Sequence, residues 1–336
     1  MKKIVLSLLF ISFVVQSCIN EPTMEKNDPK GNFEALWKII DTKYCYLDYK
    51  HIRWDSIHSV YAARVDNDMS NMALFDLLGS MLAELQDGHV NLYSNFNTSR
   101  NWKWFTEYPS NFDTDLIYNE RYLGANYFSV SGLKYAKIAN GKVGYIYFGD
   151  FSNRFSDTNM YNIFSYFINC EALIIDVRNN GGGYLDLAEQ FASYFFKEKT
   201  LTAYIQHKEG NGHSDFSKPV AIYTPGHKTL QWQRPVAVLT NRMSYSATNA
   251  FVVRMKMANH AIIVGDQTGG GGGLPMSSEL PNGWMVRLSQ SPMFDADMQQ
   301  TEWGITPDVP VVLNIALRAN GMDSIIESAI SLITKN

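Results

Sequence analysis

The chain has 336 residues, of which 46% are hydrophobic and 18% charged, and its formal net charge is −4. These values are typical of a globular protein with a sizeable core and exclude a disordered chain. There is no basic run, zinc-type Cys/His spacing or Walker-type phosphate loop, so we expect no nucleic acid partner, no metal and no other cofactor.

The first 18 residues predict a lipoprotein signal peptide. Two lysines precede an apolar run over residues 4–15, which is too short to span a bilayer comfortably. The ending Val15-Gln-Ser-Cys18 resembles a bacterial lipobox, in which the cysteine is lipidated and becomes the first residue of the mature chain. A plain signal peptide cleaved near Ser17 and an uncleaved anchor are the alternatives. We therefore expect a lipid on Cys18, an anchor in the bacterial cell envelope (periplasmic side or cell surface), and a polar tether over residues 19–31.

The next part of the chain predicts a small N-terminal helical domain over residues 32–92. Apolar residues recur near helical spacing in three patches, at 33–40, 54–65 and 72–85. Gly88 follows the third patch as a natural helix stop, which leaves His89 free to project into a cleft.

Residues 93–140 are polar and aromatic with weak periodicity, which indicates connecting loops and short strands. From residue 141 to 336, apolar runs alternate with amphipathic segments, which predicts an α/β layer architecture. The expected strands are 143–148, 173–177, 201–206, 220–223, 236–240 and 261–264, and the expected helices are 184–196, the segment after Ser246, and 324–333. Cys170 is expected in the core, and whether Cys45 and Cys170 are oxidised stays open.

The segment Asp176–Gly183 ends in three glycines between a buried strand and a helix. Glycine lets the backbone turn sharply and brings bare N–H groups close to a ligand. The Gly-x-Gly-x-x-Gly pattern of dinucleotide-binding turns is absent. A purely structural turn and an oxyanion site are both compatible with this segment.

The segment Asn241–Phe251 carries the most chemical information in the chain. It joins the strand at 236–240 to a helix, so a small, hydroxyl-rich turn lies where the first N–H groups of the helix are unpaired. These groups and the helix dipole favour negative charge, which develops on the oxygen of an attacked carbonyl. Ser246 is therefore a candidate nucleophile, and helix capping by the serines and threonine is the alternative.

Two further residues could complete a site, although each is a weak signal by itself. His89 is one of seven histidines, and a single histidine is more often structural or solvated. Glu302 lies in an aromatic turn shaped by glycine and proline, where a partly buried carboxylate can orient an imidazole. A glutamate in a surface loop is the alternative.

Four segments occur together and in order. They are Asp176-Val-Arg-Asn-Asn-Gly-Gly-Gly183, Asn241-Arg-x-Ser-x-Ser-Ala-Thr248, Ile263-Val-Gly-Asp-Gln-Thr268 and Glu302-x-Gly-Ile-x-Pro-Asp-Val309. This pattern resembles the S41 peptidases, which include the tail-specific (C-terminal processing) proteases and the tricorn core protease, over about residues 32–335. The resemblance implies a ClpP/crotonase-like α/β fold for the second half and serine peptidase chemistry.

The family divides over the general base. Processing proteases carry a lysine shortly after the third segment, where this chain has Gly269–Gly273. The tricorn-like branch uses an N-terminal histidine and a late glutamate. The resemblance therefore implies Ser246 as nucleophile, His89 as base and Glu302 as orienting group, with Ser244 as the fallback nucleophile.

The same resemblance implies hydrolysis through an acyl-enzyme. His89 would take the proton of the Ser246 hydroxyl and return it to the leaving amine, so activity should rise through the unperturbed imidazole range of about pH 6–7. The N–H of Ala247 and one N–H from the triple-glycine turn, assigned to Gly182, would stabilise the oxyanion.

The chain departs from known patterns of this family at two points. Gly88 stands where tricorn has a serine that tunes the base, and too little chain separates His89 from residue 143 for a typical PDZ domain. If His89 is not the base, Lys256 and His260 are the next candidates.

Two other functions stay open. A non-catalytic ligand- or peptide-binding protein on the same fold is one, since retinoid-binding relatives of the family exist. An acyl-CoA enzyme on a crotonase-like core is the other, and export argues against it. The substrate, the residue preferred at the cut, the oligomeric state and the membrane leaflet do not follow from the sequence.

Overall fold

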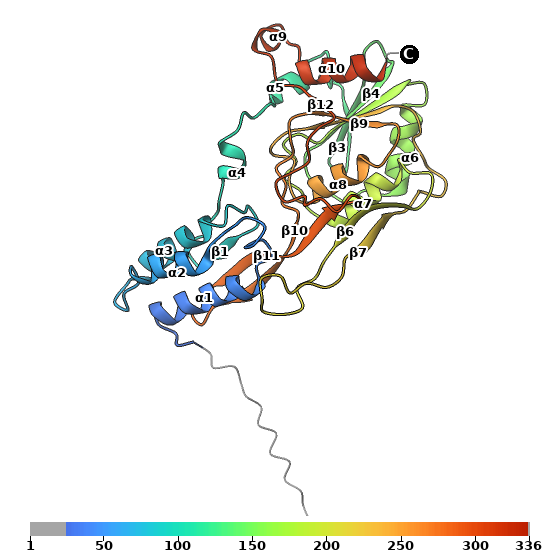
Figure 1. Cartoon of the computed structure of the whole chain (residues 1–336). Coiled ribbons are helices and arrows are strands. Elements are labelled where there is room, and N and C mark those ends of the chain that lie inside the picture. The colour runs from blue at the N-terminus through green and yellow to red at the C-terminus, as the bar shows by residue number, and fades with distance from the viewer. Residues whose placement is uncertain (1–24, 335–336) are drawn as a thin grey trace, which may run out of the picture.

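The computed structural model describes residues 25–334, and the signal peptide and the lipidation at Cys18 therefore lie outside the described residues (Figure 1). Helix α1 (Pro29–Lys43) begins earlier than the predicted tether allows. The Asp28 side chain accepts a hydrogen bond of 2.8 Å from the Gly31 N–H, and a proline occupies the first helical turn. Both features favour a helix start, so the helix begins within the stretch 19–31 that the sequence predicted as a tether.

Helices α1, α2 (Trp54–Ala62) and α3 (Asn71–Ala83) form the expected N-terminal helical module. The module does not close on itself. Strand β1 (Asn91–Tyr93) pairs antiparallel with β11 (Met285–Asp295), and the core around Phe33 also contains Trp284 and Leu288. The predicted boundary at residue 92 therefore does not enclose an independent domain.

A long hairpin connects the two parts of the molecule and was not predicted. Strand β10 (Gly273–Glu279) pairs antiparallel with β11, and the hairpin runs from the α/β part into the helical module (Figure 1). Because its inner face completes the core of the helices, the hairpin fixes the module against the rest of the chain.

Helix α3 does not stop at Gly88. Its last residue is Ala83, and Gln86 adopts the left-handed conformation with φ 48°. Gly88 instead provides space, because a Cβ there would lie 2.6 Å from Trp104 Nε1 and 2.7 Å from Tyr245 Oη.

The connecting region is more ordered than its weak periodicity indicates. It contains α4 (Lys103–Thr106), α5 (Thr114–Ile117), β2 (Phe128–Val130) and β3 (Leu133–Ile138). Strand β3 pairs antiparallel with β4 (Val143–Phe148) and thereby extends the central sheet.

The central sheet has seven strands in the order β12-β9-β8-β5-β4-β3-β2. The strands β4, β5 (Ala172–Asp176), β8 (Val236–Thr240), β9 (Ala261–Gly265) and β12 (Val309–Pro310) run parallel. Every residue of β5 and β8 is buried, as the continuous apolar runs predict for a parallel sheet covered on both faces.

Helices cover both faces of this sheet. One face packs against α6 (Asp157–Tyr166), α7 (Leu185–Ser193) and α8 (Ala247–Met255), and the other against α10 (Ser324–Ile333). The α/β architecture is therefore as expected, although α6 was not predicted. Cys170 lies in the core as expected, and Cys45 and Cys170 are buried free thiols.

A second sheet has the order β1-β11-β6-β7, with β10 on β11, and includes β6 (Thr200–Ile205) and β7 (Val220–Thr224). The short helix α9 (Ile315–Ala319) precedes α10. Within residues 25–334, no helix is long and apolar enough to cross a membrane.

Candidate active site

Ser246 stands directly before α8, at the end of the turn that follows β8. Its backbone is in a strained conformation, with φ 59° and ψ −119°, which for a residue with a side chain costs about 1–3 kcal/mol. Its N–H donates to the carbonyl of Gly270 at 2.9 Å, which holds the turn in place. The Ser246 side chain makes no capping hydrogen bond to α8, so helix capping does not explain this residue.

The hydroxyl of Ser246 meets the imidazole of His89. The Ser246 Oγ lies 2.9 Å from His89 Nε2, a separation at which a base can take the proton of a nucleophile. His89 comes from the segment between α3 and β1, and only 4% of its surface is exposed. The fold thus brings together the two residues that the sequence pattern proposed as nucleophile and base.

Ser244 has a different role. Its Oγ donates to the carbonyl of Val177 at 2.8 Å and accepts from the Asn241 N–H at 3.1 Å, and the residue is fully buried. These bonds tie the turn before α8 to the end of β5. Ser244 therefore stabilises the turn, and its hydroxyl bonds to Val177 and Asn241, whereas that of Ser246 meets His89.

Burial keeps His89 neutral. Burial, with a smaller contribution from the positive charge of Arg287, lowers the pKa of His89 to about 4, although the Asp87 carboxylate and the Gly273 backbone act to raise it. An imidazole that is neutral at neutral pH can accept a proton at Nε2 if its own proton is on Nδ1. Among the described residues, Nδ1 has no hydrogen-bond partner.

The carboxylate of Asp87 anchors the His89 segment. Its oxygens accept hydrogen bonds from the His89 N–H at 2.7 Å, from Tyr44 Oη at 3.0 Å and from Ser289 Oγ at 2.9 Å. Burial alone would raise the pKa of Asp87, but Lys50, His89 and these hydrogen bonds hold it below its usual value. Asp87 is thus a buried anion that fixes the backbone on which His89 stands.

Glu302 does not contact His89 directly. Its Oε1 lies 2.7 Å from Lys50 Nζ, and its Oε2 accepts a hydrogen bond from the Gly272 N–H at 3.1 Å. Burial, together with the Asp87 carboxylate, raises the pKa of Glu302 to about 8, although Lys50 lowers it. The sequence predicted that Glu302 would contact the imidazole of His89 directly. The structure instead places its carboxyl group in hydrogen-bond contact with Lys50.

Lys50 was not expected from the sequence. Only 2% of its side chain is exposed, and its Nζ donates to the carbonyls of Leu85 and Gln86 and lies 3.9 Å from Asp87. It also lies 4.6 Å from the centre of the Trp303 ring. Lys50 therefore links the two carboxylates, and through them the segment carrying His89 to the turn carrying Glu302. Its sequence surroundings contain no motif that could have indicated this role.

Two backbone groups were proposed as oxyanion donors. The N–H of Ala247 is at the N-terminus of α8, where no preceding helical carbonyl is available. Gly182 lies next to it, because a Cβ on Gly182 would be 2.9 Å from Ser246 Cβ and 3.0 Å from the Ala247 nitrogen. However, the Gly182 N–H already donates to Asn180 Oδ1 at 3.0 Å. Gly182 could serve an oxyanion only by sharing or releasing this hydrogen bond.

The glycine run Gly269–Gly273 lies against the candidate site, where a side chain would not fit. A Cβ on Gly270 would be 1.8 Å from the Glu302 carbonyl oxygen, and one on Gly271 would be 2.5 Å from the Tyr245 ring. The Gly271 N–H donates to the Glu302 carbonyl at 3.1 Å. The run is therefore a close backbone contact that positions Ser246 and Glu302.

The other proposed bases have different partners. Lys256 pairs with Asp308 at 2.9 Å, and its Nζ donates to the carbonyl of Thr306. His260 contacts the carbonyl of Trp232 at 3.0 Å through Nε2. Neither lines the cavities that contain Ser246.

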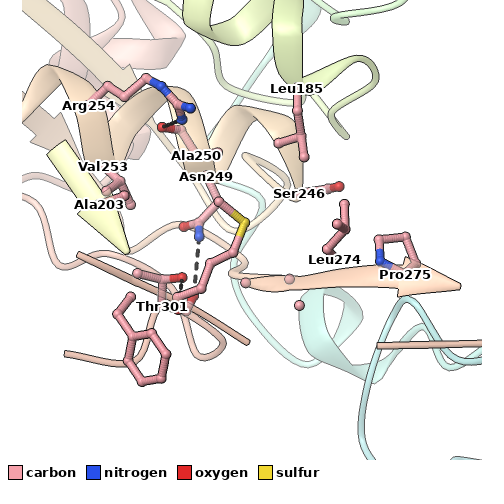
Figure 2. A pocket seen from close by; sticks show the side chains of 15 residues that line it. Leu185, Ala203, Ser246, Asn249, Ala250, Val253, Arg254, Leu274, Pro275 and Thr301 are labelled. Carbon is pink, nitrogen blue, oxygen red and sulfur yellow. Dashed lines mark hydrogen bonds between the residues drawn. The ribbon is translucent and has the colours of Figure 1, made fainter. Parts of the chain in front are cut away.

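Two cavities meet at Ser246. One is an apolar pocket between α8 and the β10–β11 hairpin, and Figure 2 shows Ser246 near Leu185 and Leu274, with Arg254 farther along the helix. Its volume is only ≈ 20 Å³, so a substrate side chain could enter only if the walls moved. The other is a cleft of ≈ 480 Å³, lined by His89 and the triple-glycine turn, which is within the size range of ligand sites.

Comparisons with known proteins identify the family of the chain. Residues 142–311 match the model of peptidase family S41, and residues 25–83 match that of the tricorn protease C1 domain. The second match covers the helical module that supplies Lys50.

Curated relatives match part of the chain. The carboxy-terminal processing protease CtpB of Bacillus subtilis is 34% identical over 119 residues, which is 35% of this chain and 23% of the relative. The tail-specific protease of Haemophilus influenzae is 29% identical over 123 residues, which is 37% of this chain and 16% of the relative. The matches thus span less than a quarter of the length of these two relatives.

Among solved structures, one from Parabacteroides merdae is 46% identical and covers 92% of this chain and 98% of that chain, with a TM-score of 0.89. Mature CPAF is 13% identical and covers 91% of this chain and 96% of that chain, with a TM-score of 0.65. The second likeness shows a shared fold alone.

Proposed function

Because the chain belongs to peptidase family S41, we propose that it is a serine endopeptidase that hydrolyses peptide bonds in exported proteins or peptides. The observation that carries this proposal is the 2.9 Å contact between Ser246 Oγ and His89 Nε2. A hydroxyl that merely capped a helix would bond to the helix backbone, and this one does not. A serine hydroxyl within hydrogen-bond reach of a neutral imidazole is the arrangement in which a base can activate a nucleophile.

The proposed reaction has two stages. In the first, His89 Nε2 takes the Ser246 proton while Oγ bonds to the substrate carbonyl carbon, and the resulting imidazolium then protonates the leaving amine as the peptide bond breaks. In the second, His89 takes a proton from water, the hydroxide attacks the acyl-enzyme, and the proton returns to Ser246 as the acid product leaves.

The oxyanion forms in both stages and needs donors. The Ala247 N–H at the start of α8 is the first, and an N–H of the Gly181–Gly183 turn, assigned to Gly182, is the second. Removal of one such donor typically costs about 2.7–4 kcal/mol of transition-state stabilisation.

The buried charges support the base in this proposal. The Asp87 carboxylate raises the pKa of His89 and so favours the imidazolium that forms during attack. Glu302 acts at longer range, through Lys50 and the glycine run, on the geometry of the same segment. We therefore assign Glu302 a positioning role that does not require direct contact with the imidazole.

The location of the protein is also a proposal. The lipobox-like ending at Cys18 supports a lipid-anchored protein of the bacterial cell envelope, which would meet exported proteins and peptides as substrates. The membrane would then be a partner only through the lipid.

A peptide-cleavage assay tests the proposed function. The purified chain without its first 24 residues should cut unfolded protein substrates, and the products should be seen by mass spectrometry. Ser246→Ala and His89→Ala should each lose at least about a thousandfold in kcat. A matched control is His51→Asn, because His51 is exposed and outside both cavities. Equal cleavage by His89→Ala and the wild type would overturn the assignment, and absence of cleavage by the wild type would favour a peptide-binding protein.

A further inference from the structure

The cleft beside Ser246 is positively charged, although the whole chain has a net charge of −4. Its lining includes two arginines, Arg100 and Arg287, as well as His89. No aspartate or glutamate lines it, and His89 is neutral because its pKa is low. A cleft whose charged groups all have one sign attracts a ligand of the opposite sign.

Arg287 stands close to the candidate base. It lies on β11 directly opposite Asn91 of β1, and directly opposed residues project from the same face of a sheet. Asn91 is two residues after His89, and all three residues line the cleft. The Arg287 charge is near enough to lower the pKa of His89.

Arg287 has no carboxylate partner among residues 25–334. Arg121, Arg178 and Arg318 each form an ion pair, with Glu327, with Asp176 and Asp323, and with Asp113 respectively. Arg287 is only partly exposed, yet its side chain makes neither a salt bridge nor a hydrogen bond with any described residue. A half-buried guanidinium with five free donors is available to a ligand.

Arg100 and an aromatic wall complete the cleft. The Arg100 guanidinium lies 5.2 Å from the centre of the Trp102 ring and also has no carboxylate partner within the described part of the chain. Trp104 stacks on Tyr245, with ring centres 4.0 Å apart, and Tyr245 precedes Ser246. The aromatic side chains of Trp102, Trp104 and Tyr245 therefore line the cleft up to the turn that carries Ser246. The guanidinium groups of Arg100 and Arg287 are the charged groups that line it.

We propose that this cleft binds a carboxylate of the substrate close to the bond that is cut, with Arg287 as the specificity-determining residue and Arg100 as a second contact. This inference rests on the proposed peptidase function. Arginine pairs with carboxylates through two parallel hydrogen bonds, which gives geometric selectivity as well as charge. Two sources have this chemistry: an aspartate or glutamate side chain near the cut, and the free carboxylate at the C-terminus of the peptide.

The test uses one cleaved peptide, chosen from the products of the unfolded-protein assay, in matched forms. In the first pair, one peptide ends in a free C-terminal carboxylate and the other in a C-terminal amide. In the second kind of pair, one peptide has glutamate and the other glutamine at a position next to the cut, and each such position is tested in turn. The ratio of kcat/KM within a pair measures carboxylate recognition, and the pair that shows it identifies the source. A charged hydrogen bond of this kind typically changes kcat/KM by about 10- to 100-fold.

Variants assign the effect to the cleft. Arg287→Gln should reduce the ratio to about onefold, mainly by raising KM for the carboxylate form. Arg287→Lys should keep part of the preference because it keeps the charge. Arg64→Gln is the matched control, since Arg64 lies over Tyr61 in the helical module and does not line the cleft.

The outcomes separate the inference from the function on which it rests. If the wild type cuts carboxylate and neutral forms of every pair equally, the carboxylate site is wrong and the peptidase function stands. If a preference exists but persists in Arg287→Gln, the assignment to Arg287 is wrong. If Arg287→Gln lowers the cleavage of both forms alike, with thermal unfolding unchanged, Arg287 supports the base and does not select substrates.

Discussion

The Nε2 of His89 lies 2.9 Å from the Oγ of Ser246, although His89 follows a helix of the N-terminal module and Ser246 begins a helix of the α/β part. The contact therefore depends on how the two parts are joined. The β10–β11 hairpin makes that junction, because β11 pairs with β1 next to His89 and β10 begins at the glycine run next to Ser246. The proposed site is thus built between segments that neither part could supply alone.

The two serines of the turn should respond oppositely to substitution. Ser244→Ala removes a buried hydroxyl that bonds to Val177 and Asn241, which should cost about 1–3 kcal/mol of unfolding free energy and leave most of the activity. Ser246→Ala should abolish activity with little loss of stability. Urea unfolding and peptide cleavage on both variants check this. If Ser244→Ala folds stably but loses activity while Ser246→Ala stays active, the roles of the two serines are exchanged.

The buried contact of Lys50 with Glu302 should be essential for stability. Lys50→Met leaves Glu302 without its hydrogen-bond donor and the buried Asp87 carboxylate without its neighbouring cation, and breaking a buried pair in this way typically costs about 3–5 kcal/mol. The double variant Lys50→Met, Glu302→Gln replaces the carboxyl group that has lost its donor and should recover part of the loss. Unfolding curves of both single variants and the double variant give the coupling. Additive costs would show that the two side chains act independently.

Activity should persist to lower pH than an ordinary imidazole allows. The base works in its neutral form, and burial lowers the pKa of His89 to about 4, so activity of the free enzyme should be lost only as the pH falls towards that value. The sequence alone led us to expect a rise through about pH 6–7, because an unperturbed histidine titrates there. The pH profile of kcat/KM checks this, and an acid limb near 6.5 would mean that His89 is more solvated than the structure shows.

Acid should also destabilise the fold through the same group. The folded-state pKa of His89 lies below its unfolded value near 6.5, so the unfolded chain binds more protons between these two values. Stability contributed by neutral His89 is present above pH 6.5 and is lost as the pH falls towards 4. His89→Ala should flatten this part of the stability curve relative to the wild type.

Lipidation at Cys18 is a prediction from the sequence, and it concerns residues outside the described part of the chain. The protein expressed in full in a bacterium should partition into membranes, and mass spectrometry should show a diacylated or triacylated N-terminal cysteine. Cys18→Ala should release it into the soluble fraction. A mature wild-type chain that begins at Ile19 without a lipid would remove the anchor and leave the peptidase proposal intact.

Local sequence patterns predicted many of the secondary-structure elements and two residues of the candidate site. The pattern of apolar residues predicted the buried strands β5 and β8, the helices α3 and α7, and the turn before α8. Ser246 and His89 were named from motifs, and the fold brings them into contact.

Contacts between distant segments could not be derived in this way. Lys50 lies in no motif, and its partner Glu302 is far along the chain, so only the fold shows the ion pair. The same holds for the β10–β11 hairpin, which completes the core of the helices through Trp284 and Leu288. The Asn180 side chain accepts a hydrogen bond from the Gly182 N–H. A sequence motif cannot show this bond, because it depends on the rotamer of Asn180.

Covalent labelling of Ser246 tests the central claim most directly. The purified chain should react with a fluorophosphonate to give a single adduct, located on Ser246 by peptide mass spectrometry. Ser246→Ala should not react, Ser244→Ala should react, and His89→Ala should react far more slowly because its hydroxyl has lost the base. A wild-type protein that is folded yet unlabelled, or one labelled equally well in Ser246→Ala, would contradict the assignment of Ser246 as the nucleophile.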